Sequence, residues 1–312
     1  MRIAIIGAGG VGGYFGARLA LAGEDVHFVA RGAQLAAMRA AGLRVRRDGG
    51  DLDVRPVRAT DDPTAIGPVD VVLVAVKLWD TESAAAMARA LMGPHTAVVS
   101  LQNGVRKDDT LRGILGAGNV MGGVCYISAY LEAPGVIRQV GTMQKIVFGE
   151  YDGRASARAS ALLASLQRAG IDAALSDAIA RVIWEKFVFL ACLAGTTSAI
   201  RLPIGAVRGH PVTRALFRDA LAEAVAVARA EGVAIADAFV DDRMAFADSL
   251  PATMTSSMHG DLEHGRRLEL DWLSGDVVAR GKRLGVLTPV HRALNDVLVL
   301  HASGRDSGTP KI

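Results

Sequence analysis

The 312-residue chain has few cysteines, few aromatic side chains and little excess charge of either sign. Its two cysteines, Cys125 and Cys192, both lie in apolar stretches, so neither a disulfide framework nor a cysteine-based zinc site is expected. Lys and Arg number 35 against 32 Asp and Glu, a net charge of +3, and no run of five basic residues occurs. Nucleic acid is therefore not an expected partner.

Long apolar runs are also absent. The least polar stretch, residues 187–200, holds 14 uncharged residues, fewer than the ~20 that span a bilayer. Glycines follow the apolar residues 3–6, where a signal peptide would continue its apolar core. We therefore expect a cytoplasmic protein without membrane contact. The apolar fraction of 51% is ample for folded cores, and the length exceeds the ~250–300 residues of a single core, which favours two domains.

The first thirty residues have the pattern of a strand, a glycine turn and a helix. An apolar run at residues 3–6 precedes the turn, and an Ala- and Leu-rich stretch at residues 14–22 follows it. The GxGxxG turn consists of Gly7, Ala8, Gly9, Gly10, Val11 and Gly12. In dinucleotide-binding domains such glycines make the turn, admit the pyrophosphate and let the helix pack closely, while the helix N-terminus attracts the anion. We predict a dinucleotide site here, and a merely structural turn is the alternative.

Arg31 follows the second predicted strand, Asp25–Val29. A site that prefers NAD carries Asp or Glu at this place to accept a hydrogen bond from the ribose 2′-hydroxyl. An arginine instead suits the 2′-phosphate of NADP through charge-assisted hydrogen bonds. The residue therefore favours NADP(H) as cofactor, with a solvated arginine at a strand end as the alternative.

Two more polar residues stand where predicted strands end. Lys77 follows the nearly continuous apolar run 69–76, which is typical of a strand buried on both faces, and Asn103 follows the run 97–101. Ligands of open α/β sheets bind beyond the carboxyl ends of the strands. We therefore expect the glycine turn, Arg31, Lys77 and Asn103 at one sheet edge, although each alone is compatible with an ordinary surface group. Further strands are predicted at residues 120–128, 135–140, 145–149 and 171–175.

The chain changes character after Ser176, where strand–helix alternation gives way to long helical patterns interrupted by prolines. We predict an α/β fold with a Rossmann-type dinucleotide-binding domain at 1–176 and an all-helical domain at 177–312. Residues 303–312 have the composition of a frayed polar tail. The apolar C-terminal helices are compatible with a homodimer, but the sequence does not fix the oligomeric state.

Lys186 is the candidate proton donor that carbonyl reduction needs besides a hydride carrier. It is the last charge before the 14 uncharged residues. Burial disfavours the ammonium form and moves a lysine toward donation at neutral pH. A lysine that pairs with Glu185, or extends out of a core helix, is the alternative.

Several motifs occur together in the order and spacing of the ketopantoate reductases (2-dehydropantoate 2-reductases), which the chain resembles from residue 1 to about residue 300. They are GxGxxG at 7–12, Arg31, Lys77, QNG at 102–104, WEK at 184–186, SSM at 256–258 and LELD at 268–271. The GxGxxG is generic, whereas W-x-K and SSM…E-x-D are much more specific. The resemblance implies a Rossmann domain, a helical C-terminal domain and NADPH-dependent reduction of a 2-oxo acid, as in pantothenate biosynthesis.

The resemblance also implies roles for individual residues. Lys186 matches the family's proton donor, and Asn103 matches a residue that contacts both cofactor and substrate. Ser257 matches a ligand of the substrate carboxylate and Glu269 a residue near the cofactor ribose, while Ser128 falls near a cofactor-contacting position. The alternative for Ser257 is a helix cap, and the alternative for Glu269 is a surface carboxylate paired with Arg266 or Arg267.

Ser257 and Glu269 are twelve residues apart, which on one straight helix is about 18 Å. One small substrate cannot touch both at that distance. Either the helix begins after Ser257, or the two residues contact different ends of the ternary complex.

The chain departs from the family where asparagines usually contact the substrate. Leu190 and Ala194 stand four and eight residues after Lys186, and Ile204 occupies a further asparagine position. A site that hydrogen-bonds a hydroxyl discriminates by ~10⁴–10⁵, and an apolar pocket by far less. The sequence therefore supports the chemistry better than ketopantoate itself, and the hydroxyls of residues 196–198 are candidate replacements.

The function we predict is NADPH-dependent reduction of a 2-oxo acid, with 2-dehydropantoate to pantoate as the leading reaction. A different, less polar 2-oxo acid is the first alternative, followed by a non-catalytic NADP(H)-binding sensor. An enzyme of related architecture, such as a 3-hydroxy acid or opine-type dehydrogenase, is a further one.

Overall fold

The computed structural model describes residues 1–305, which divide into two units. Unit 1 comprises Met1–Asn103 and Lys107–Val182, and unit 2 comprises Gly104–Arg106 and the chain from Ile183 onward. The division falls inside helix α6 (Ile179–Ile200), a few residues after the boundary that the sequence analysis placed near residue 176. Of the predicted tail at 303–312, residues 306–312 lie outside the described residues. The amide of Arg305 donates to the Gly265 carbonyl at 2.8 Å, so the first part of this segment is attached to unit 2.

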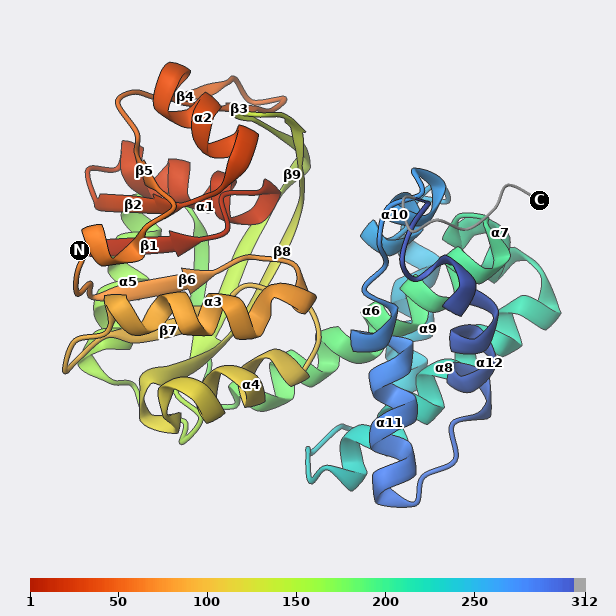
Figure 1. Ribbon diagram of the computed structural model, residues 1–312. Coiled ribbons are helices and arrows are strands. Elements are labelled where there is room, and N and C mark those ends of the chain that lie inside the picture. The colour runs from red at the N-terminus through yellow and green to blue at the C-terminus, as the bar shows by residue number, and fades with distance from the viewer. Residues whose placement is uncertain (306–312) are drawn as a thin grey trace. The chain divides into compact units, whose positions relative to one another are not determined.

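Unit 1 is built on a ten-stranded mixed sheet (Figure 1). The strands are β1 (Arg2–Ile6), β2 (Asp25–Val29), β3 (Leu43–Arg46), β4 (Leu52–Val54), β5 (Arg58–Thr60), β6 (Val71–Val74), β7 (Ala97–Ser100), β8 (Val120–Ala133), β9 (Val136–Gly149) and β10 (Asp172–Leu175). Their order is β4-β3-β9-β8-β7-β6-β1-β2-β5, with β10 paired to β9. From β5 to β8 all pairings are parallel. The order of these six strands is that of a Rossmann fold, which confirms the predicted class.

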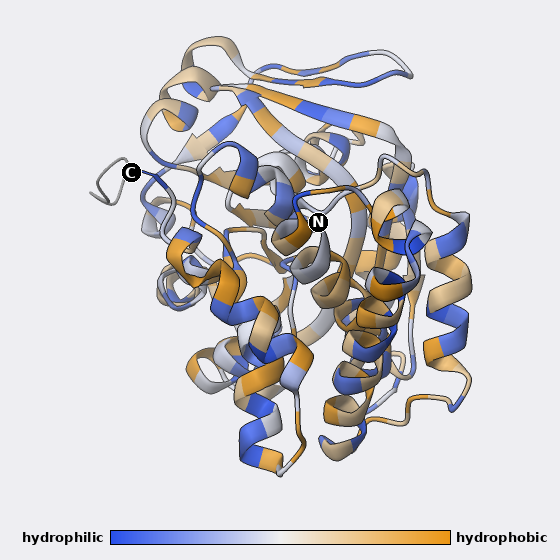
Figure 2. Ribbon diagram, turned by 90° about the vertical axis from the view of Figure 1, so that its right-hand side faces the viewer, coloured by the Kyte–Doolittle hydropathy of each residue, from blue (hydrophilic) through white to orange (hydrophobic). Residues whose placement is uncertain are grey.

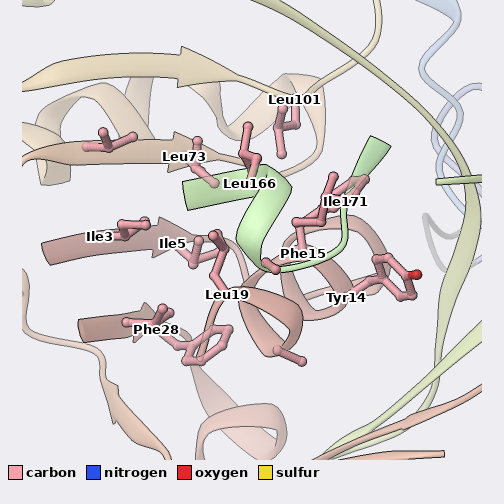
Figure 3. Packing of buried hydrophobic residues seen from close by; sticks show 14 of the residues in the cluster. Ile3, Ile5, Tyr14, Phe15, Leu19, Phe28, Leu73, Leu101, Leu166 and Ile171 are labelled. Carbon is pink, nitrogen blue, oxygen red and sulfur yellow. The ribbon is translucent and has the colours of Figure 1, made fainter. Parts of the chain in front are cut away.

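Helices cover both faces of this sheet, because the central strands are apolar on both sides. The helices of unit 1 are α1 (Gly10–Leu21), α2 (Gly32–Ala41), α3 (Thr81–Ala88), α4 (Arg106–Leu115) and α5 (Ala157–Arg168). Alternate residues of β1 serve different cores: Ile3 and Ile5 pack with residues of α1, α2 and α5, whereas Ala4 and Ile6 pack with α3 and α4. Figure 3 shows the first of these cores, with Ile5 of β1 beside residues of α1 and α5.

The long hairpin of β8 and β9 corrects one part of the sequence analysis. The predicted strands at 135–140 and 145–149 form the single strand β9, and β8 continues beyond residue 128. The two strands pair antiparallel, with a register shift between Ile127 and Ala129. Residues 130–133 of β8 and 140–143 of β9 are exposed, so their side chains lack the alternation that reveals a half-buried strand, whereas Ile137 and Gln139 of β9 are buried. Backbone hydrogen bonds between β8 and β9, which the sequence does not reveal, hold the hairpin together.

Unit 2 consists of helices and turns, with no strand among its described residues, as predicted. After α6 come α7 (Ile204–Gly209), α8 (Pro211–Ala230), α9 (Phe239–Ser249), α10 (Ser257–Glu263), α11 (Ser274–Leu284) and α12 (Pro289–Leu298). Phe189 of α6 packs edge-on against Phe217 of α8 and Phe246 of α9, with ring centroids 6.0 and 5.1 Å apart. The helix ribbons alternate between hydrophobic and hydrophilic colours along their length (Figure 2), as amphipathic helices do.

Candidate active site

The GxGxxG turn joins β1 to α1 and leaves room beside one of its glycines. Gly7 has a φ of +99°, and its amide donates to the Val29 carbonyl at 3.1 Å. A β-carbon added to Gly7 would lie 2.8 Å from the backbone nitrogen of Val76, and one added to Gly12 would lie 2.1 Å from the Gly7 carbonyl oxygen. Gly9 differs, because a β-carbon there would meet nothing within 4 Å. The turn thus has the open approach that a pyrophosphate needs.

The N-terminus of α1 lies at the same place. Gly9 is the N-cap residue and has no side chain to satisfy the amides of the first turn, which begins with Gly10 and Val11. Unpaired amides and the helix dipole together favour an anion at this end of the helix. The open space and the donor set therefore fit the pyrophosphate of a dinucleotide.

Gln34 of α2 supports the turn and was not singled out by the sequence analysis. Its Nε2 donates to the carbonyl of Ala8 at 2.8 Å, and its Oε1 accepts from the amide of Gly135 at 2.7 Å. One side-chain amide therefore ties the buried Ala8 to the turn between β8 and β9. No local pattern distinguishes Gln34 from other polar residues of a helix, so only the tertiary contact identifies it.

The sheet register brings the predicted strand-end residues to one edge. Ile6 pairs with Val74, and Val74 pairs with Ser100, in parallel ladders. The glycine turn follows Ile6 directly, while Lys77 and Asn103 each stand three residues beyond their strand's paired position. Lys77 is exposed and Asn103 is half-buried. The structure therefore gathers the glycine turn, Lys77 and Asn103 at the carboxyl edge of neighbouring strands.

Arg31 lies at the same edge, two residues beyond the strand β2 that pairs with β1. Its side chain is 81% exposed, and its Nη2 lies 2.9 Å from the Oδ2 of Asp80. Asp80 ends the short 3-10 turn Leu78–Asp80 that follows Lys77, and sequence reasoning missed it. Ion pairs with an exposed partner contribute only about 0–1 kcal/mol, so Asp80 holds the Arg31 side chain weakly.

Ser128 is exposed and lies at the register shift of β8. Its neighbour Ala129 passes close to the start of α1, since a β-carbon added to Gly10 would lie 2.3 Å from the Ala129 carbonyl oxygen. Ser128 therefore stands next to the helix end that carries the glycine turn.

Unit 2 holds the remaining predicted residues, and Lys186 lies in the first half of α6. Lys186 is half-buried between two buried aromatic residues of the same helix, Trp184 and Phe187. Their rings pack edge-on with centroids 5.4 Å apart, and the Arg280 guanidinium lies 5.5 Å from the Trp184 ring centroid. Lys186 thus keeps accessible surface on a helix whose neighbouring positions 184 and 187 are buried.

The three apolar residues at the family's usual asparagine positions differ in exposure. Leu190 is half-buried, whereas Ala194 and Ile204 have no exposed surface. The candidate replacement hydroxyls are also fully buried: Thr196 and Thr197 donate to carbonyls one turn earlier in α6, at 2.7 and 2.6 Å. The hydroxyls of Thr196 and Thr197 are therefore bonded within α6, whereas the buried Ser198 Oγ has no hydrogen-bond partner among residues 1–305. Leu190 alone keeps accessible surface among the three departures.

Ser257 is not the cap of its helix. Ser256 takes that role, and its Oγ accepts from the amide of His259 at 3.0 Å. Ser257 is the first residue of α10 and its side chain is exposed. The Nδ1 of the buried His259 lies 2.9 Å from the Thr197 carbonyl oxygen, which attaches α10 to α6. The hydroxyl of Ser257 is therefore held on a fixed helix end.

Glu269 is buried at 7% exposure, so it is not a surface carboxylate. Arg266, one of the partners considered for it, pairs with Asp261 at 2.7 Å. Helix α10 ends at Glu263, and Gly265 adopts a φ of +66°. Ser257 and Glu269 therefore do not share one helix, so the distance calculated for one straight helix does not apply to them.

Two further properties bear on the class of site. Within residues 1–305, no group of three or more His, Cys, Asp or Glu side chains is arranged to hold a metal ion. No helix in the same range is long and apolar enough to cross a membrane.

Comparison with protein families matches both parts of the chain. The family described as ketopantoate reductase PanE/ApbA matches residues 3–153, and its C-terminal counterpart matches residues 178–301. A 2-dehydropantoate 2-reductase of Mesorhizobium japonicum is 34% identical over 316 aligned positions, which cover 93% of this chain and 94% of the relative.

Solved structures agree with this assignment. A PanE/ApbA family ketopantoate reductase from Ralstonia eutropha JMP134 superposes with a TM-score of 0.88 at 36% identity, covering 97% of this chain and 98% of the other. A ternary structure of D-mandelate dehydrogenase with NADH and anilino(oxo)acetate gives a TM-score of 0.87 at 22% identity, with the same coverage of 97% and 98%. At that identity the second likeness shows the fold alone.

Proposed function

Because this chain belongs to the ketopantoate reductase family of oxidoreductases, we propose that it reduces a 2-oxo acid to a 2-hydroxy acid with NADPH. The leading substrate is 2-dehydropantoate, which would give pantoate. The observation that carries the proposal is the sheet edge of unit 1, where the glycine turn, Arg31, Lys77 and Asn103 follow four neighbouring strands.

NADPH is the proposed cofactor on the strength of Arg31. The end of β2 carries this arginine where an NAD-preferring site carries an acid. Its side chain is exposed and engaged only at the surface by Asp80, so a 2′-phosphate can take the place of that carboxylate. From the family pattern, we assign Glu269 to the neighbourhood of the cofactor ribose and Ser128 to a further contact with the cofactor.

A bound nicotinamide dinucleotide supplies the hydride. Lys186 donates a proton from Nζ to the ketone oxygen as negative charge develops there, and the alkoxide becomes the hydroxyl of the product. Such general-acid assistance is worth about 10²–10⁴-fold. Ser257 donates its hydroxyl proton to the substrate carboxylate, and the Asn103 amide orients both the substrate and the dinucleotide.

A less polar 2-oxo acid is the second candidate substrate, favoured by Leu190, Ala194 and Ile204. Ala194 and Ile204 have no exposed surface, so neither offers substrate a polar contact, and the accessible Leu190 is apolar. Aryl-substituted 2-oxo acids, whose side groups are apolar, are therefore included among the test substrates.

The proposal is tested with Lys186→Ala. We expect kcat to fall by about 10²-fold or more while the Kd for NADPH stays near the wild-type value. Lys282→Ala, which removes an exposed lysine of α11 in the same unit, is the matched control and should leave kcat unchanged. Turnover near the wild-type rate in Lys186→Ala would remove this lysine from the mechanism.

A further inference from the structure

Gln102 lies directly before Asn103, and its side chain is buried at 6% exposure. A buried amide must find hydrogen-bond partners, because an unsatisfied one is costly. Its Oε1 accepts from the Ser100 Oγ at 2.9 Å, and its Nε2 lies 2.9 Å from the Thr81 Oγ1 and 3.4 Å from the Lys77 carbonyl oxygen. The amide thus joins the end of β7 to the segment that follows β6.

The surrounding bonds fix which way this amide points. The Thr81 Oγ1 donates its only proton to the Leu78 carbonyl at 2.7 Å, so toward Gln102 it must accept. The Lys77 carbonyl oxygen also only accepts. The Ser100 Oγ accepts the backbone amide of Gln102 at 3.2 Å and therefore donates to the side-chain oxygen. Nε2 consequently faces the Lys77 segment, and Oε1 faces β7.

A buried lysine fixes the β7 side of this connection. Lys107 has almost no exposed surface, and its Nζ donates to the Gly123 carbonyl at 3.0 Å and to the Ser100 carbonyl at 3.4 Å. Asp108 balances its charge at 2.9 Å and accepts from the Tyr151 hydroxyl at 2.8 Å. The end of β7 is therefore anchored, and Gln102 transmits that anchoring to the segment that carries Lys77.

We propose that Gln102 is a positioning residue for dinucleotide binding, which acts by holding the Lys77 segment in place against the turn that carries Asn103. This inference rests on the proposed function of the sheet edge and deepens it. Without the amide, the Thr81 hydroxyl loses its donor, and the Lys77 carbonyl keeps the Asp80 amide at 2.9 Å but loses its contact with β7. The Lys77 segment is then less restrained, so more conformational entropy is lost when Lys77 reaches the bound dinucleotide.

The test measures the Kd for NADPH by fluorescence titration of the full chain. Gln102→Met keeps the side-chain length without hydrogen bonding and should raise the Kd by about 3- to 10-fold, the loss of one or two net hydrogen bonds. Thr81→Val should act in the same direction, whereas Thr81→Ser keeps the hydroxyl and should stay within about twofold of wild type. A wild-type Kd in a folded Gln102→Met protein would overturn the role, and if that variant does not fold, equal Kd values for Thr81→Val and Thr81→Ser would do so.

Thr96→Val is the matched control. Thr96 is an equally buried threonine of unit 1, before the amino end of β7, and its Oγ1 donates to the Val69 carbonyl at 2.5 Å and accepts from the Gly93 amide at 2.8 Å. Its replacement should lower Tm but leave the Kd for NADPH unchanged. An increase equal to that of Thr81→Val would mean a general loss of stability and would overturn the proposal.

A double-mutant cycle separates positioning from a merely structural role. Lys77→Ala keeps the carbonyl that Gln102 contacts but removes the side chain to be positioned. The effect of Gln102→Met on the Kd should shrink to about twofold or less in that background. Full additivity would overturn action through Lys77. A wild-type protein that binds neither NADPH nor NADH would overturn the proposed function together with this role.

Discussion

The sheet edge of unit 1 and the first half of α6 in unit 2 hold their proposed site residues in different ways. At the sheet edge, buried or half-buried amides brace the backbone that carries them: Gln34 contacts Ala8, and Gln102 contacts the Lys77 carbonyl. On α6, the residues one and two turns after Lys186 are the apolar Leu190 and Ala194, and Ala194 is fully buried. If the proposed function holds, the cofactor residues are polar and supported by side-chain amides, whereas the positions proposed to meet the substrate are apolar, so the two kinds of recognition can change independently.

The glycine turn offers the largest effect on this comparison. Gly12→Ala forces a β-carbon to within 2.1 Å of the Gly7 carbonyl oxygen, so the backbone must shift at a cost of about 1–3 kcal/mol or more. Gly9→Ala meets no protein atom, so Tm should hold while the methyl group fills the dinucleotide approach and raises the Kd for NADPH by about tenfold or more. Thermal unfolding and fluorescence titration measure both. Unchanged NADPH affinity in Gly9→Ala would contradict the placement of the pyrophosphate.

Acid should weaken unit 2 through His291. Burial lowers the pKa of this imidazole from 6.5 to about 4, while its ring Nε2 lies 3.1 Å from the Ala220 carbonyl oxygen. Well above pH 6.5 the residue is neutral in both states and contributes no pH dependence. As the pH falls from 6.5 toward about 4, the unfolded chain takes up a proton that the folded chain does not, so the free energy of unfolding falls by about 3 kcal/mol.

His291→Gln keeps a donor for the Ala220 carbonyl and removes the titration, so its stability curve should be flatter over this range. His264→Gln, at an exposed position, is the control and should keep the wild-type slope. Urea unfolding at a series of pH values measures how the free energy of unfolding changes with pH. Equal slopes for wild type and His291→Gln would show that His291 is not the source of the pH dependence.

Restoring asparagine on α6 should separate the two departures by their burial. Ala194→Asn places a larger polar group in a site with no exposed surface and should cost about 1–3 kcal/mol of stability. Leu190→Asn lies at a half-buried position, should cost less, and should raise kcat/KM for hydroxyl-bearing 2-oxo acids relative to unsubstituted ones. Chemical denaturation and steady-state kinetics report the two effects. If Leu190→Asn left the substrate ranking unchanged, Leu190 would not face the substrate.

The smallest effect concerns the choice of cofactor. Arg31→Asp should weaken NADPH binding by about tenfold while changing NADH binding much less, since only NADPH carries the 2′-phosphate. Asp80→Asn frees Arg31 from its carboxylate and should tighten NADPH binding slightly. The ratio of the two Kd values is the measurement, and equal losses for NADPH and NADH in Arg31→Asp would argue against a phosphate contact.

Local pattern was enough to predict the Rossmann order and the convergence of Lys77 and Asn103. Buried parallel strands leave continuous apolar runs, and parallel register brings their ends together. The end of β8 and the continuity of β9 were missed because residues 130–133 and 140–143 are exposed and carry no period. Gln34 and Asp80 were missed because their partners are distant in sequence: Ala8 and Gly135 for one, Arg31 for the other.

In unit 2 the catalytic role of Lys186 stays a prediction, and the structure decides two alternatives that the sequence left open. Ser256 rather than Ser257 caps α10. With two adjacent serines, the sequence alone does not show which of them is the cap residue. Thr196 and Thr197 have no exposed surface, and their hydroxyls bond within their own helix. The sequence could not show this, because the composition of an apolar helix does not reveal which of its faces is covered.

The most direct test is the rate at which the purified protein oxidises NADPH in the presence of a panel of 2-oxo acids. The panel contains 2-dehydropantoate, unsubstituted aliphatic acids and aryl-substituted acids, each also tried with NADH. We predict turnover with at least one member, faster with NADPH than with NADH, and its loss in Lys186→Ala. Silence across the panel together with tight NADPH binding would contradict a reductase and favour a dinucleotide sensor.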